Sequence, residues 1–295
     1  METKKKSDTL IRIITGAVAI GIFVPVCIFS ETIVFPIVIG LLCLIGVYEM
    51  AKCLSLDKNY AITIPMYLIA LALPILRHGL FFKDNSTYFG LAIILMFCML
   101  IYVLAYVMFK NNNIKLTEIL PLYALFVYIV GCFVSMVIVR YTDANLAVGG
   151  KTVNGVYVYL LAFIGAWVCD TFAYFTGRFF GKHKLIPEIS PKKTIEGSIG
   201  GIMFTVGSFA LYTFIVNSCF GQSLSYLKVC IIGFVLSIIS QIGDLVASSV
   251  KRQYELKDYG KLFPGHGGVL DRFDSVMLTA PTLVIMSLVL GYFNV

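Results

Sequence analysis

Three acidic residues in the second half of the chain could together bind a divalent metal ion. Asp244 lies inside a long apolar run, and Asp271 and Asp274 lie three residues apart at the start of another. Residues at this spacing share one face of a helix, so the last two carboxylates can converge. Asp170, inside a third apolar run, is a further acidic member. Carboxylate oxygens suit Mg²⁺ better than Zn²⁺, so the pattern predicts a magnesium site.

Basic side chains accompany these carboxylates in the sequence. Lys251, Arg252 and Arg272 lie in the segment that separates Asp244 from Asp274, and the Gly-rich stretch 265–268 lets the backbone approach a ligand closely. Carboxylates, basic groups and a Gly-rich turn are the components of a site for a metal-bound polyphosphate. The histidine in this turn, at position 266, is interpreted as a hydrogen-bonding loop residue rather than as a metal ligand.

A second basic loop, Ser190–Gly197, has the features of a phosphate site. Its proline fixes a turn, Lys192 and Lys193 supply cationic donors, and Thr194 offers a hydroxyl group at the start of a helix. A helix N-terminus beside lysines binds phosphate readily. An ordinary basic loop at the inner surface of a membrane would explain the same residues, and this alternative stays open.

The composition indicates that membrane helices position these residues. Of the 295 residues, 59% are hydrophobic and 13% are charged, whereas soluble domains have about 45–50% apolar and about 25% charged residues. These values exclude a soluble globular enzyme and a disordered chain. Nine apolar runs approach the length that a membrane-spanning helix needs. They are Ile13–Phe29, Ile33–Met50, Ala61–Leu76, Tyr88–Phe109, Ile119–Val139, Val156–Phe175, Ile199–Val216, Val229–Val250 and Ser275–Phe293.

The basic residues indicate how these spans are oriented. Most of the 23 Lys and Arg residues fall in inner segments if the N-terminus is cytoplasmic and the C-terminus is outside. Asp170 and Asp244 then lie at matching depth, about 10 Å of helix from an inner loop. Ionisable groups at membrane depth tend to mark functional sites. We therefore expect one all-α membrane domain, with residues 1–150 as a scaffold and residues 151–295 as the catalytic half.

Two pairs of glycines predict close contacts between helices in the catalytic half. Gly177 and Gly181 lie four residues apart, as do Gly197 and Gly201. This spacing places small residues on one helix face, which lets a neighbouring backbone come near.

The stretch Ser248–Asp274 resembles the phosphatidate cytidylyltransferases, also called CDP-diacylglycerol synthases. It matches the family pattern S-x-V-K-R-x4-K-D-x-G-x2-F-P-x-H-G-G-V-x-D-R-F-D position for position. The loop Ser190–Gly197 and the acidic residues Asp170 and Asp244 also resemble elements of this family. The first 150 residues match only in being hydrophobic spans.

The resemblance implies an Mg²⁺-dependent reaction of CTP with phosphatidate that gives CDP-diacylglycerol and pyrophosphate. The phosphate monoester of the lipid is largely a dianion at neutral pH, so it can attack the α-phosphorus of CTP without a general base. The residues expected to carry the reaction are Asp244, Asp271, Asp274, Lys251, Arg252 and Arg272. Those expected to bind the substrates are Ser190, Lys192, Lys193, Thr194, Glu196, Lys257, Asp258, His266, Gly267 and Gly268.

The expected location is the cell membrane, with several spans and an active site that faces the cytoplasm. A monovalent cation such as K⁺ beside Mg²⁺ is compatible with the resemblance, and the oligomeric state is open, with a homodimer as one option. The net charge of +7 needs no nucleic-acid partner, because topology explains it. One alternative is a CTP-dependent polyprenol or phytol kinase, which would release CDP. Another is a transporter, which would spread charges through the membrane depth.

Overall fold

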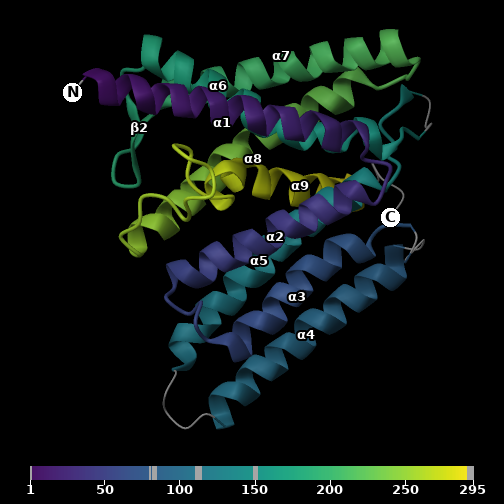
Figure 1. The fold of residues 1–295 in the computed structure, drawn as a ribbon. Helices are drawn as coiled ribbons and strands as arrows, with labels where there is room; N and C mark the ends of the chain where they lie inside the picture. The colour runs from purple at the N-terminus through teal and green to yellow at the C-terminus, as the bar shows by residue number, and fades with distance from the viewer. Residues whose placement is uncertain (1, 80, 82–84, 110–114, 149–151, 291–295) are drawn as a thin grey trace. The chain divides into compact units, whose positions relative to one another are not determined.

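The computed structural model describes residues 2–79, 81, 85–109, 115–148 and 152–290, and the side chains of 2–13, 85 and 287–290 are outside this description. Most of the described chain is helical (Figure 1). The elements are α1 (Glu2–Ile28), α2 (Val34–Cys53), α3 (Tyr60–Leu76), α4 (Asn85–Phe109), α5 (Leu116–Arg140), the 3-10 helix η2 (Gly155–Tyr157), α6 (Tyr159–Phe180), β1 (Lys184–Ile186), β2 (Ser190–Thr194), α7 (Ile195–Phe220), α8 (Tyr226–Gln253) and α9 (Leu270–Leu290).

Six of the described helices, α2 and α4 to α8, are long and apolar enough to cross a membrane. The chain is therefore a multi-pass membrane protein. Shorter apolar helical stretches cover Ile14–Ile28 and Tyr60–Leu76, and the second of these contains Pro65 and Pro74. A total of nine spans and a cytoplasmic N-terminus stay predictions. The end of the last expected span, 291–293, lies outside the described residues.

The chain divides into two compact units. Unit 1 contains residues 1–137 and 254–272, and unit 2 contains residues 138–253 and 273–295. The segment 254–272, which carries most of the family-like motif, thus packs with the N-terminal helices. Whether both units belong to one membrane domain, as expected, stays a prediction.

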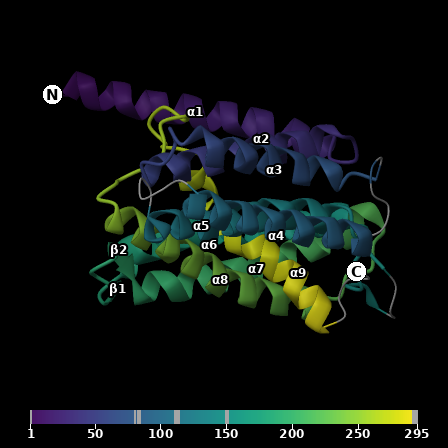
Figure 2. The same ribbon diagram turned by 90° about the horizontal axis from the view of Figure 1, so that it is seen from below.

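In unit 1, helices α2 and α3 run side by side (Figures 1 and 2). A Cβ atom at Gly40 of α2 would lie 2.7 Å from the carbonyl oxygen of Leu71 in α3, so only glycine permits this approach. Helix α4 packs on α3, where the buried Tyr88 donates a hydrogen bond of 3.0 Å to the carbonyl oxygen of Leu73. These contacts hold the N-terminal helices together.

In unit 2, helix α7 packs closely on α6 and on α8. A Cβ atom at Gly197 would lie 2.7 Å from the carbonyl oxygen of Ala173, and one at Gly201 would lie 3.0 Å from that of Cys169. The expected close helix packing is thus confirmed for Gly197 and Gly201, and Gly177 faces Gly197 in the same contact, whereas Gly181 lies just after α6 and faces Thr194. The antiparallel pair β1–β2, in which Lys184 lies opposite Thr194, was not expected from the sequence.

Candidate active site

Three carboxylates of unit 2 form an acidic cluster. Asp170 comes from α6, Asp244 from α8 and Asp274 from α9. The hydroxyl group of Ser275 donates to Asp170 Oδ2 at 2.6 Å and lies 3.5 Å from Asp274 Oδ1, while Asp244 and Asp170 both interact electrostatically with Asp274. Helices α8 and α9 meet closely at Gly243, where a Cβ atom would lie 2.8 Å from the carbonyl oxygen of Asp274. The structure therefore brings together three acids that are far apart in sequence.

Two lysines partly balance this acidic cluster. Lys193 of β2 forms an ion pair with Asp244, with 2.7 Å between Nζ and Oδ2, and Ser248 donates to the other oxygen of Asp244 at 3.3 Å. The buried Lys251 interacts electrostatically with Asp274. Partly exposed ion pairs contribute only about 0–1 kcal/mol, so an incoming phosphate or metal ion could separate Lys193 from its partner.

The donor set of this cluster suits a hard divalent cation. Three carboxyl groups gather beside the ammonium groups of Lys193 and Lys251, so the cluster offers several oxygen ligands at one place. Carboxylate oxygens are the ligands that Mg²⁺ prefers in proteins. Within the part of the chain that the structure describes, no three His, Cys, Asp or Glu side chains are arranged so that they could hold an ion as they stand. Chemically the residues fit Mg²⁺, and binding would require the side chains to close around the ion.

The other residues expected in the hairpin loop support its fold. The Thr194 hydroxyl accepts the N–H of Gly197 at 3.1 Å and caps the start of α7. Glu196 accepts the N–H of Lys182 at 3.0 Å and contacts the ring of His183 at 2.6 Å, which closes the connection between α6 and β1. Ser190 lies on β2 opposite Ile186. Lys192 of β2 is exposed, and so is another expected site residue, Arg252, which lies in the last turn of α8.

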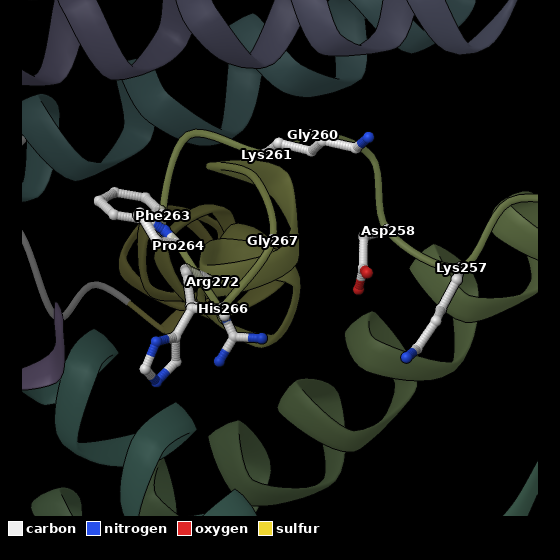
Figure 3. A pocket seen from close by; sticks show the side chains of 10 residues that line it. Lys257, Asp258, Gly260, Lys261, Phe263, Pro264, His266, Gly267 and Arg272 are labelled. Atoms are coloured by element: carbon white, nitrogen blue, oxygen red, sulfur yellow. The ribbon is translucent and has the colours of Figure 1, made fainter. Parts of the chain in front are cut away.

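The segment 257–272 of unit 1 forms a basic pocket of about 580 Å³. Figure 3 shows the side chains of Lys257, Asp258, His266 and Arg272, all expected site residues, pointing to the same side of this pocket. Lys261 also lines it, so three cations stand against one carboxylate. The Nδ1 atom of His266 is buried and has no hydrogen-bond partner among the described residues. The pocket therefore suits a polyanionic ligand.

A tight turn presents His266 to this pocket. Phe263 donates its N–H to the carbonyl oxygen of Gly267 at 2.8 Å, and His266 donates its N–H to that of Phe263 at 2.8 Å. Gly265 and Gly267 have φ values of +75° and +87°, a region that side chains other than hydrogen strongly disfavour. The Gly-rich turn expected from the sequence is thus required by the backbone.

Comparison with known proteins decides the family. The model of the cytidylyltransferase family matches residues 10–290. The chain belongs to the cytidylyltransferase family. It is 34% identical over 277 residues to the phosphatidate cytidylyltransferase of Staphylococcus haemolyticus, which covers 94% of this chain and 98% of the relative. The protein of that name in Bacillus subtilis is 32% identical over 276 residues, 92% of this chain and 95% of the relative. These matches confirm the family that the motif indicated.

In this cytidylyltransferase, Asp271 holds the motif segment in place. Its side chain is buried, and Oδ2 accepts the N–H of Tyr259 at 2.8 Å and that of Gly268 at 2.9 Å. A Cβ atom at Gly267 would lie 2.7 Å from the same oxygen. The expected role of Asp271 as a metal ligand stays a prediction, and the structure adds this organising role to it.

A second buried carboxylate of the cytidylyltransferase was missed in the sequence. Glu49 of α2 is only 4% exposed, and it accepts the N–H of Val269 at Oε1 and that of Leu270 at Oε2, both at 3.0 Å. The available signal was an acidic residue within the apolar run Ile33–Met50. An ionisable group there is unusual enough to indicate a role.

Proposed function

We propose that this chain is a phosphatidate cytidylyltransferase, which combines CTP and phosphatidate into CDP-diacylglycerol and pyrophosphate. The observation that supports this most directly is the basic pocket, because it is built wholly from the motif segment of a chain whose relatives carry that name. Its volume of about 580 Å³ lies within the range of about 300–1,000 Å³ that small-molecule sites have.

The chemistry requires alignment and charge neutralisation more than proton transfer. An oxygen of the lipid phosphate bonds to the α-phosphorus of CTP, the bond from that phosphorus to the bridging oxygen breaks, and pyrophosphate leaves with its electrons. Because the attacking phosphate is already ionised, no general base is needed. Positioned cations that match the charge of the phosphates then supply most of the catalysis.

The residues of the two clusters divide this work in the proposal. Lys257 and Arg272 contact phosphate oxygens in the basic pocket, and the ring of His266, which lines the same pocket, donates a hydrogen bond to one of them. When substrate and metal bind, the ion pair between Lys193 and Asp244 opens, and Lys193 then contacts a phosphate.

The remaining expected site residues are assigned by their motif positions. Lys251 and Arg252 contact phosphates, and Ser190, Lys192, Thr194, Glu196, Asp258, Gly267 and Gly268 shape the substrate sites. Mg²⁺ would be held by Asp244, Asp271 and Asp274, with Asp170 as a further acidic member, and would neutralise charge on the phosphates. Support for the metal comes from the three carboxyl groups that α6, α8 and α9 bring together in the acidic cluster.

We further propose nine spans in the plasma membrane, a cytoplasmic N-terminus and an active site at the cytoplasmic face. The distribution of Lys and Arg residues supports this orientation. A reporter enzyme that works only outside the cytoplasm should be active when it is fused to the C-terminus. Assembly as a homodimer and a K⁺ ion beside Mg²⁺ belong to the same proposal, and they can be checked by the mass of the detergent-solubilised protein and by the dependence of activity on K⁺.

The deciding experiment is an assay of the purified protein in detergent micelles that contain phosphatidate. With radiolabelled CTP and Mg²⁺, we expect labelled CDP-diacylglycerol on thin-layer chromatography and one pyrophosphate for each lipid formed. A parallel reaction without phosphatidate should give neither product. Release of CDP with phosphorylation of an added polyprenol would instead identify a lipid kinase and refute the proposal.

A further inference from the structure

Glu49 meets the start of α9, where backbone N–H groups need a partner. The first N–H groups of any helix lack an acceptor within the helix, and the positive end of the helix dipole favours a negative charge nearby. The N–H groups of Val269 and Leu270 each donate to one oxygen of Glu49, although more than 200 residues separate them from it in sequence. Helix α2 thus supplies the cap of α9.

Two glycines of the motif leave room for this carboxylate. A Cβ atom at Gly260 or at Gly268 would overlap with Oε1 of Glu49. The backbone at both positions has no positive φ, so a side chain there is opposed by Glu49 and not by backbone strain. The glycines at 260 and 268 therefore indicate that the motif segment is shaped around Glu49.

The carboxylates of Glu49 and Asp271 together fix both ends of the basic pocket. Asp271 accepts the N–H of Tyr259 and of Gly268, and Glu49 accepts the next two N–H groups along the chain. The pocket residues, from Lys257 to Arg272, lie within or directly beside this fastened segment. All of these residues belong to unit 1.

We propose that Glu49 is a positioning residue of the transfer reaction, a role that rests on the proposed function. Its carboxylate holds the start of α9 and the preceding turn, so that His266 and Arg272 keep the arrangement that binds phosphate. The N-terminal helices therefore take part in catalysis through this residue as well as serving as a scaffold. Removal of the carboxylate leaves buried N–H groups without a partner, which should loosen the segment.

A double-mutant cycle between Glu49 and Gly268 tests this role. Glu49→Ala removes the carboxylate, and Gly268→Ala displaces it while leaving it in the chain. We expect each single variant to lower kcat at saturating CTP by at least about tenfold and to speed tryptic cleavage after Lys257 and Lys261, which are exposed. In the double variant, Gly268→Ala should lower kcat by less than about twofold beyond Glu49→Ala, because its target is already gone.

Matched controls come from the same unit. Glu118 of α5 is exposed and also accepts a backbone N–H, that of Lys115 at 3.3 Å, so Glu118→Ala should leave kcat and cleavage unchanged. Gly90 of α4 has nothing within 4 Å of an added Cβ, so Gly90→Ala should also leave kcat and the rate of tryptic cleavage unchanged. All kcat values are measured on the monodisperse, folded fraction.

Each outcome decides the proposal. If the two substitutions lower kcat by factors that multiply in the double variant, the proposal is overturned. A wild-type kcat in Gly268→Ala would overturn it as well. If Glu49→Ala does not fold, Gly268→Ala and Gly260→Ala still test the proposal, because an added Cβ at either position displaces Glu49 and a wild-type kcat in either variant would overturn it. If the wild type makes no CDP-diacylglycerol, the proposed function fails, and the tryptic rates then decide whether Glu49 fastens the segment.

Discussion

The close contact of α8 and α9 at Gly243 allows a quantitative prediction. A Cβ atom at this position would lie 2.8 Å from the carbonyl oxygen of Asp274, whereas ordinary van der Waals contact begins at 3.4 Å. Gly243→Ala must therefore separate the two helices by about 0.6 Å, because the obstacle is helix backbone that cannot rotate away. Overpacking of this kind typically destabilises a protein by about 1–3 kcal/mol.

The consequence for activity follows from the neighbours of this contact. Asp244 lies directly after Gly243 on α8, and Asp274 supplies the carbonyl oxygen, so the separation moves two acids of the proposed metal site apart. A misplacement of about 1 Å at reacting groups can lower a rate by about 100-fold. We therefore expect Gly243→Ala to lower kcat by about 10- to 100-fold while the protein still folds.

The assay is the formation of CDP-diacylglycerol by monodisperse protein, with thermal unfolding measured in parallel. Gly207→Ala is the matched control, because Gly207 also lies in a helix of unit 2 and an added Cβ there has nothing within 4 Å. If Gly243→Ala retains the kcat of Gly207→Ala, then the alignment of Asp244 with Asp274 does not limit catalysis, and the reasoning fails.

Three further predictions concern the acidic cluster and the hairpin. Asp244→Asn should lower kcat at least about 100-fold, because it removes a proposed metal ligand and the partner of Lys193; near wild-type product formation would contradict the assignment. Chelation of divalent ions should abolish product formation and added Mg²⁺ should restore it, so activity that persists with excess chelator would argue against the metal. Thr194→Ala removes the cap of α7 and should lower the free energy of unfolding by about 1 kcal/mol, measured by denaturant titration; an unchanged stability would show that the cap is dispensable.

The sequence predicted best those parts of the site that lie within one continuous segment. Lys257, Asp258, His266 and Arg272 occur within 16 positions and line one pocket, since the turn that gathers them is set by local glycines. The ion pair of Lys193 with Asp244 joins residues that were each predicted to be functional, but nothing in their spacing could reveal that they meet. Tertiary packing of β2 near α8 decides that contact.

The missed elements share a physical cause. Glu49 contacts Val269 and Leu270 across more than 200 residues, and a single sequence holds no signal for such a distant pair. Strands β1 and β2 have only three and five residues, which is too short for the alternation of polar and apolar side chains that reveals a strand. The long apolar helices, in contrast, follow from hydropathy alone.

The path of the chain between the two units limits how this enzyme can be divided. The chain leaves unit 1 after residue 137, returns for 254–272 and then leaves again within α9. A fragment that ends near residue 150 keeps Glu49 but lacks the N–H groups of Val269 and Leu270 that bind it. In such a piece Glu49 would lie in an apolar helix without these partners, so the N-terminal half depends for this contact on backbone that is synthesised only near the end of the chain.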